Sequence, residues 1–385
     1  MPYFSFSLKQ NFLNKPEMPI EWQTIKVNKV YFSKNTLLWK NLIKNKNKEF
    51  INNVKFENRL KNNNLKGKTL FCLPPSIGLG DSIEYALAFN SIFIKKEFKN
   101  SAIAFCGKYK IIFEKYFDFK NKVYADFISQ NEILKFDNIF HLSLEIPELK
   151  YQKYIRSDIE SVLTKFFKTS KKRKPLKKKK IKINKINIFP ISKSPIRTMP
   201  ANLINEIIVS FSKKYEINVV LDNSAISVAI EKNIKTKNFN KLKPESLESL
   251  IQIVKKTEFG IFVDSGPLHL AKIFGIEGVL MITTVSDKIL LNNFKTIHPI
   301  KNFFTSAHCV APCGLTNLFN YNNLVGCYES LKIKKENLLK IGNINSMQRG
   351  QIKKTYTDFI DEPVSCIKNI KFNFFIDQIN QKILK

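Results

Sequence analysis

From residue 68 onward the chain alternates short apolar runs with longer amphipathic stretches. The run at 69–74 is typical of a buried strand, and a helix is expected to begin at Asp81 because apolar residues then recur every three or four positions. That stripe contains Ile83, Ala86, Leu87 and Ile94. Apolar runs at 102–106, 123–128 and 139–144 follow. Strands that alternate with helices predict a parallel sheet.

The same alternation restarts at residue 181. Strands are expected at 181–189, 217–221, 259–263 and 279–283, and helices from Pro200 and at 246–254 and 267–274. An amphipathic segment at 374–384 is expected to pack back towards the first domain. The chain is therefore divided into an N-terminal extension, a first α/β domain, a basic linker, a second α/β domain and a C-terminal segment: 1–66, 67–170, 171–180, 181–345 and 346–385.

Composition favours a soluble globular protein. Hydrophobic residues make up 44% of the chain and the mean hydropathy is -0.19. The longest apolar region, 260–285, is interrupted by Asp264, His269, Lys272 and Glu277, so no transmembrane helix is predicted. The N-terminus lacks a basic start followed by an apolar stretch, so no secretory signal peptide is expected.

The net charge of +32 raises the question of nucleic-acid binding. Only five of the 64 basic residues are arginine, the side chain favoured for bidentate recognition of phosphates and bases, and no nucleic-acid-binding motif accompanies the charge. No nucleic-acid partner is expected. A basic surface would instead attract an anionic membrane or a phosphorylated glycolipid. Ten basic residues gather at 165–180, which predicts a solvated linker, with a membrane contact as the alternative.

The six cysteines predict reduced thiols rather than a disulfide framework. Zinc binds to histidine and cysteine side chains, and the segment at 308–327 offers His308, Cys309, Cys313 and Cys327. The short Cys-x3-Cys spacing, however, lacks a second pair. We expect these thiols to hold no metal.

Two glycines and an aspartate follow the first predicted strand. Gly78 and Gly80 allow a tight turn and a close approach by a substrate, and Asp81 and Ser82 then open the helix. In an open α/β sheet this is the edge at which ligands bind. Asp81 is a candidate catalytic carboxylate; the alternative is a helix cap without a role in catalysis.

A second motif follows the strand at 259–263. Asp264, Ser265 and Gly266 form a turn, Pro267 suits the first position of a helix, and His269 lies in the first helical turn. The N–H groups at such a helix start bind phosphate, which makes this a candidate nucleotide site. The alternative is a capped helix with a half-buried histidine.

The loop at 189–200 also lies between a strand and a helix. Ser192, Lys193 and Arg197 offer donors to an anionic ligand. An ordinary loop of a lysine-rich chain is the alternative.

In order and spacing these stretches resemble glycosyltransferase family 9, the lipopolysaccharide heptosyltransferases. Residues 264–271 resemble the donor motif of the family, Gly80-Asp81 its N-terminal loop, and residues 309–313 with Cys327 its later cysteines. Two positions depart from the family: Arg197 stands where it places a lysine, and Asp222 begins a turn that is Gly-rich in the family.

The resemblance implies a GT-B fold, in which two Rossmann-like domains face a central cleft, and an inverting sugar transfer that needs no cofactor and no metal. Asp81 would be the general base, beside an acceptor-side loop of Gly78, Gly80 and Ser82. Asp264, Ser265, Gly266, His269, Ser192, Lys193, Arg197 and Asp222 would bind the donor, an ADP-sugar being favoured.

The acceptor expected from this resemblance is a glycan or glycolipid of a bacterial cell envelope. The expected location is the cytoplasm, with peripheral contact at the inner face of the inner membrane. The alternative function is a non-catalytic cationic module that binds nucleic acid or an anionic membrane surface. An intact Asp264–His269 motif together with Asp81 favours the enzyme.

Overall fold

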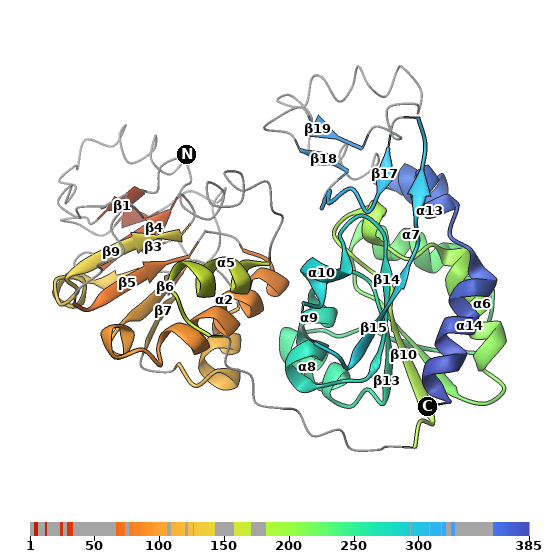
Figure 1. Ribbon diagram of the computed structural model, residues 1–385, viewed down its shortest axis with the longest axis horizontal. Coiled ribbons are helices and arrows are strands. Elements are labelled where there is room, and N and C mark those ends of the chain that lie inside the picture. Colours follow the sequence, from red (N-terminus) through yellow and green to blue (C-terminus); the bar gives the residue numbers. More distant parts are fainter. Residues whose placement is uncertain are drawn as a thin grey trace. The chain divides into compact units, whose positions relative to one another are not determined.

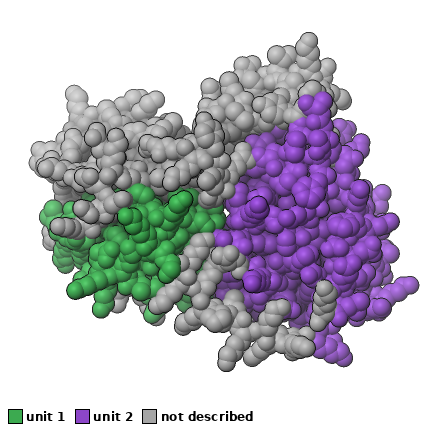
Figure 2. Space-filling model, viewed as in Figure 1, with its two compact units in different colours: residues 1–174 green, residues 175–385 purple. Residues whose placement is uncertain are grey.

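The computed structural model divides into two units, residues 1–174 and 175–385 (Figure 2). It describes residues 4–6, 12–13, 24–25, 29–33, 67–73, 77–105, 109–119, 122–125, 127–142, 158–170, 182–292, 294–307, 309–316, 318–320, 325–327 and 357–384. The linker expected at 171–180 lies outside these residues.

Unit 1 is built on a parallel sheet of the order β7-β6-β5-β9 (Figure 1). Its strands are β5 (Thr69–Cys72), β6 (Ala102–Phe105), β7 (Val123–Ala125) and β9 (Asn138–His141). Strands β5 and β6 are buried along their whole length, as their continuous apolar runs predict.

Helix α2 (Leu79–Ile92) follows β5 and packs against α5 (Ile159–Phe166). Its predicted apolar stripe is buried except for Ile94, which lies beyond the end of the helix and is 52% exposed. Shorter helical segments are η2 (Lys96–Phe98), η3 (Ile112–Tyr116) and α3 (Gln130–Ile133). The core is aromatic: Phe71 contacts the rings of Phe89, Phe93, Phe98, Phe140 and Phe167.

The N-terminal extension contributes strands to unit 1. Strands β1 (Phe4–Phe6) and β4 (Lys29–Ser33) form an antiparallel sheet with β8 (Phe127–Ser129), and β2 (Phe12–Leu13) pairs with β3 (Thr24–Ile25). The single strand predicted at 123–128 is therefore wrong, because β7 and β8 join different sheets.

Unit 2 contains a six-stranded parallel sheet of the order β12-β11-β10-β13-β14-β15. The strands are β10 (Lys185–Phe189), β11 (Glu216–Val220), β12 (Asn240–Leu242), β13 (Phe259–Phe262), β14 (Gly278–Ile282) and β15 (Ile297–Lys301). Numbered along the chain, this is the 3-2-1-4-5-6 order of dinucleotide-binding folds.

Side-chain amides fix the register of the first three strands. The Asn218 amide donates to Asn187 Oδ1 (2.9 Å), and the Asn240 amide donates to Asn218 Oδ1 (3.1 Å). Asn187 and Asn218 are each 6% exposed, and the Asn187 amide donates to Thr257 Oγ1. A register slip would leave these buried amides without partners, which costs free energy.

Helices cover both faces of the sheet in unit 2, with α8 and α9 on one face and α6 and α14 on the other (Figure 1). The helices and helical turns between Pro195 and Leu290 are η5 (Pro195–Arg197), α6 (Ala201–Phe211), α7 (Ala225–Asn233), α8 (Leu247–Lys255), α9 (Gly266–Phe274) and α10 (Asp287–Leu290). Two short hairpins follow β15: β16 (Phe304–Thr305) with β17 (Val310–Ala311), and β18 (Phe319–Asn320) with β19 (Val325–Gly326).

The C-terminal segment packs within unit 2. After α13 (Ser365–Lys368), helix α14 (Phe372–Ile383) contacts α6, β14 and β15. Its buried residues Phe375 and Ile379 belong to the core of this unit. The helix therefore belongs to unit 2, and packing of the segment against the first domain stays a prediction.

Candidate functional site

The strand order of unit 2 reverses between β10 and β13. Connections from these two strands leave the sheet in opposite directions, which opens a ligand-binding crevice beyond their carboxyl ends. The loop at 190–200 follows β10, and the turn at 263–265 follows β13. Two of the three motifs found in the sequence therefore meet at this switch point.

Arg197 joins the two loops. Its Nη1 lies 3.0 Å from Asp264 Oδ2 and donates to the main-chain oxygen of Asp264 (2.9 Å). Its Nε donates to the main-chain oxygen of Thr316 (2.7 Å), which ties a third loop to the same point. Ser192 Oγ also donates to the Asp264 main-chain oxygen, at 3.0 Å.

These contacts separate the predicted donor-binding residues into two groups. The side chains of Arg197 and Asp264 are 14% and 11% exposed and neutralise each other, and Ser192 is buried. Lys193, in contrast, is exposed. Arg197 and Ser192 therefore hold the turn in place, while Lys193 offers a cation at the surface of the same loop.

Helix α9 begins at this turn. Its N-cap is Ser265, whose hydroxyl donates to the Val263 main-chain oxygen (3.4 Å) rather than capping the helix, and no side chain among the described residues caps it. Pro267 occupies the first turn and His269, 9% exposed, lies in the same turn. An uncapped helix start carries partial positive charge and suits a phosphate.

Asp222, which follows β11, makes local hydrogen bonds that stabilise the start of the next helix. Its Oδ1 accepts from the Ser224 N–H (2.8 Å), and its own N–H donates to Ser227 Oγ (2.9 Å). Ser224 is the N-cap of α7, so Asp222 organises the start of that helix. Strand β11 lies on the far side of β10 from β13. Asp222 is thus one strand further from the turn than the loop that contains Arg197.

In unit 1, Asp81 lies in the first turn of α2, where the sheet order reverses between β5 and β9. Its Oδ2 accepts from the Gly78 N–H (3.2 Å), and Ser82 Oγ donates to the Gly78 oxygen (2.9 Å). The side chain of Asp81 is exposed. The carboxylate therefore caps the helix and is also exposed, so its capping role is observed and its catalytic role stays a prediction.

Two tyrosines lie near Asp81. Burial, and second the negative charge of Asp81, raise the pKa of Tyr85 and of Tyr109. Tyr85 is predictable, since it follows Asp81 by one helical turn. Tyr109 follows β6 in the chain, and nothing in the sequence pattern indicated that it lies near Asp81.

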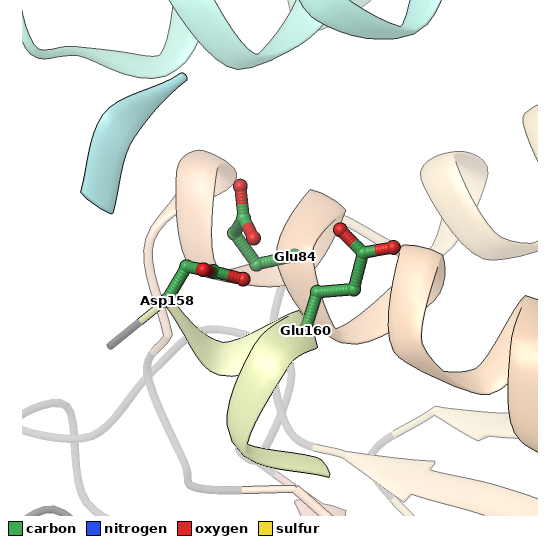
Figure 3. Close-up of side chains that lie close together, drawn as sticks. All are labelled: Glu84, Asp158 and Glu160. Atoms are coloured by element: carbon green, nitrogen blue, oxygen red, sulfur yellow. The ribbon is translucent and has the colours of Figure 1, made fainter. Parts of the chain in front are cut away.

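Three carboxylates gather where α2 meets α5. Oxygens of Glu84, Asp158 and Glu160 lie within 4.8 Å of one another (Figure 3). Asp158 is the N-cap of α5 and accepts from the Ser161 N–H at 2.7 Å. Oxygen ligands of this kind suit a hard divalent cation, and the helix start itself also favours negative charge.

Four cysteines also influence one another, although among the described residues only the three carboxylates bring their ligand atoms within 4.8 Å of one another. Burial raises the pKa of the Cys366 thiol to about 12, and the neighbouring Cys327, Cys313 and Cys309 add to the shift. The sequence analysis identified only the last three. Cys366 lies 39 residues beyond Cys327, so no spacing pattern pointed to it.

No family model matches the sequence, and no curated protein is significantly similar to it. None of the helices in the described part of the chain has the length and apolar character needed to cross a bilayer.

Solved structures do match. The dodecameric iron-containing glycosyltransferase TibC of enterotoxigenic Escherichia coli H10407 is 13% identical, with a TM-score of 0.52 over 83% of this chain and 79% of that one. TibC in complex with ADP-D-beta-D-heptose is 13% identical, with a TM-score of 0.50 over 82% and 77% of the two chains. A glycosyl transferase family 9 protein of Veillonella parvula is 12% identical over 73% and 98%, with a TM-score of 0.47. The two Rossmann-like units thus have the GT-B type of α/β fold, and the chain resembles the solved heptosyltransferases.

Proposed function

We propose that this protein is an inverting glycosyltransferase that moves a sugar from a nucleoside diphosphate donor to a glycan or glycolipid of the cell envelope. The observation that carries the proposal is the Asp264–His269 turn. It stands at the switch point of a 3-2-1-4-5-6 sheet and opens helix α9, whose first turn has no side-chain cap among the described residues. TibC, whose fold is similar, has been solved with ADP-D-beta-D-heptose, which favours an ADP-sugar, with heptose as the first candidate.

In the proposed reaction the acceptor hydroxyl oxygen attacks the anomeric carbon while the bond from that carbon to the diphosphate oxygen breaks. The electron pair of that bond leaves with the nucleoside diphosphate. Asp81 takes the hydroxyl proton. The N–H groups of the α9 start and the Lys193 ammonium would stabilise the diphosphate charge, so the catalytic step is proposed to use no metal.

Ser265 offers a test of donor binding that spares the fold. Ser265→Asp should weaken ADP binding by at least about tenfold, because a carboxylate at the helix start repels the diphosphate. Ser265→Asn is the matched control, since both residues are good N-caps and only the first adds charge. Calorimetric titration of both variants and the parent with ADP, ADP-sugars and UDP-sugars measures the effect.

Equal losses in the two variants, or no affinity of the parent for any nucleotide, would count against the proposed site. The charge of +32 keeps the cationic binding module as the second candidate. Tight binding of duplex DNA or anionic vesicles with a steep salt dependence, in a protein that binds no nucleotide, would favour that candidate.

A metal at the cysteines is a separate question from catalysis. TibC is iron-containing, and Cys309, Cys313, Cys327 and Cys366 together supply the four soft donors that iron or zinc accepts. The three cysteines identified in the sequence are too few to fill a four-coordinate site, so the sequence alone predicts metal-free thiols. Cys366 would supply the fourth ligand. We propose that these four thiols bind one structural metal ion, which would also favour the thiolate of Cys366.

Metal analysis of the purified protein should then find about one iron or zinc per chain. Cys366→Ser should lose that metal because it removes one of four thiolates. Cys72→Ala, which changes a buried cysteine of β5 in unit 1, is the control and should retain it. A parent protein without stoichiometric metal would instead support the metal-free thiols expected from the sequence.

A further inference from the structure

Helix α9 contains a buried lysine three residues after His269. Lys272 is only 1% exposed, although lysine side chains usually extend to the surface. Its Nζ donates to the main-chain oxygen of Leu290 (2.8 Å) and lies 5.0 Å from the centre of the Phe294 ring. A carbonyl oxygen and an aromatic face are both partners that suit a cation.

The same Nζ lies 3.4 Å from Nδ1 of His269. The two side chains are neighbours because residues three apart share one face of a helix. An ammonium group has three donors and no acceptor, whereas a neutral imidazole has one N–H and one acceptor nitrogen. A hydrogen bond between the two therefore requires Nδ1 to be the acceptor, which leaves the ring proton on Nε2.

We propose that Lys272 is a positioning residue that holds His269 in the Nε2–H tautomer, so that His269 donates a hydrogen bond to the diphosphate of the nucleotide donor. The choice of ligand rests on the proposed function, but the tautomer does not. In the other neutral tautomer, Nε2 would present a lone pair to the phosphate oxygens. With the lysine in place, His269 and the N–H groups of the α9 start present donors only.

The tautomer can be read directly in the full-length protein. Long-range proton–nitrogen NMR correlations of histidine-labelled protein, with His269 assigned by a His269→Gln variant, should show a protonated Nε2 and a hydrogen-bonded, unprotonated Nδ1. In Lys272→Met the hydrogen-bonded character of Nδ1 should disappear. In Lys272→Gln, whose amide can accept a hydrogen bond, an Nδ1–H population should appear.

Ligand affinity supplies the second measurement. Loss of one hydrogen bond to a charged group should weaken ADP binding by about tenfold in Lys272→Gln, the variant in which an Nδ1–H tautomer leaves Nε2 without its proton. Adenosine, which has no phosphate, should bind equally well to parent and variant. A packing defect alone would lower the affinity for ADP and for adenosine by the same factor, and that result would overturn the proposal.

A proton on Nδ1 of the parent would also overturn it, even if neither variant folds. If the parent shows the Nε2–H tautomer but binds no nucleoside diphosphate, the proposed function fails and the phosphate-donor role of His269 fails with it. The effect of Lys272 on the tautomer would still be supported by the NMR data.

Discussion

Replacing Asp81 by asparagine should lower turnover by at least about a hundredfold, the lower end of what loss of a general base typically costs. The reaction must remove a proton from the acceptor hydroxyl, and an amide cannot take it. The fold should survive, because an asparagine oxygen can still accept from the Gly78 N–H that Asp81 now caps. Initial rates with saturating donor, together with a thermal melt and a donor titration, measure the effect.

Asp137→Asn is the matched control for this prediction. Asp137 is also an exposed aspartate of unit 1 whose Oδ2 accepts from a main-chain N–H, that of Lys68, but it follows no strand of the sheet. Its variant should keep normal turnover. Near-normal turnover in Asp81→Asn would mean that Asp81 is a helix cap only, and the base would then have to be another residue.

The strands that lie inside the sheets were predictable from the sequence. β10, β11, β13 and β14 lie between other strands, and their continuous apolar runs need no alternation to be recognised. The edge strands of unit 2, β12 and β15, were missed. β12 has the sequence Asn-Lys-Leu and is largely exposed. β15 contains Pro299, which an edge position tolerates because, among the described strands, β15 pairs on one side only.

The positions of the candidate site were predictable, but the contacts within it were not. A strand followed by a turn and a helix places Asp81 and Asp264 at the ligand edge of their sheets, and sequence alone shows that pattern. The Arg197–Asp264 ion pair joins residues 67 positions apart. Only the parallel pairing of β10 with β13 brings these two residues together. The Asp81–Tyr109 proximity depends in the same way on the pairing of β5 with β6.

Lys272 illustrates a signal that was visible in the sequence but received no role there. The sequence analysis treated it as one of the charges that interrupt an apolar region. Its spacing from His269 already predicts a shared helix face, because α9 is continuous over both residues. The sequence does not show that Lys272 is buried. The proposed role depends on that burial, because a lysine on a solvent-exposed face would leave the tautomer of the histidine unconstrained.

Replacing Arg197 by methionine should destabilise unit 2 by about 3–5 kcal/mol, the usual cost of removing one partner from a buried ion pair. The Asp264 carboxylate, 11% exposed, would lose its cation, and the Thr316 carbonyl would lose its donor. For a unit of this size such a change lowers the melting temperature by on the order of 10 °C. Scanning calorimetry is the suitable measurement, because both tryptophans, Trp22 and Trp39, lie in unit 1.

Two further variants separate this structural role from direct donor binding. Arg197→Lys keeps the charge but loses the planar fork that reaches Asp264 and Thr316 together, so its melting temperature should fall between those of the parent and Arg197→Met. Arg197→Met with Asp264→Leu removes both charges and should recover part of the lost stability, because no carboxylate is then left without its cation. If Arg197→Met melts like the parent and loses only nucleotide affinity, the arginine binds the donor directly and the ion pair contributes little to the fold.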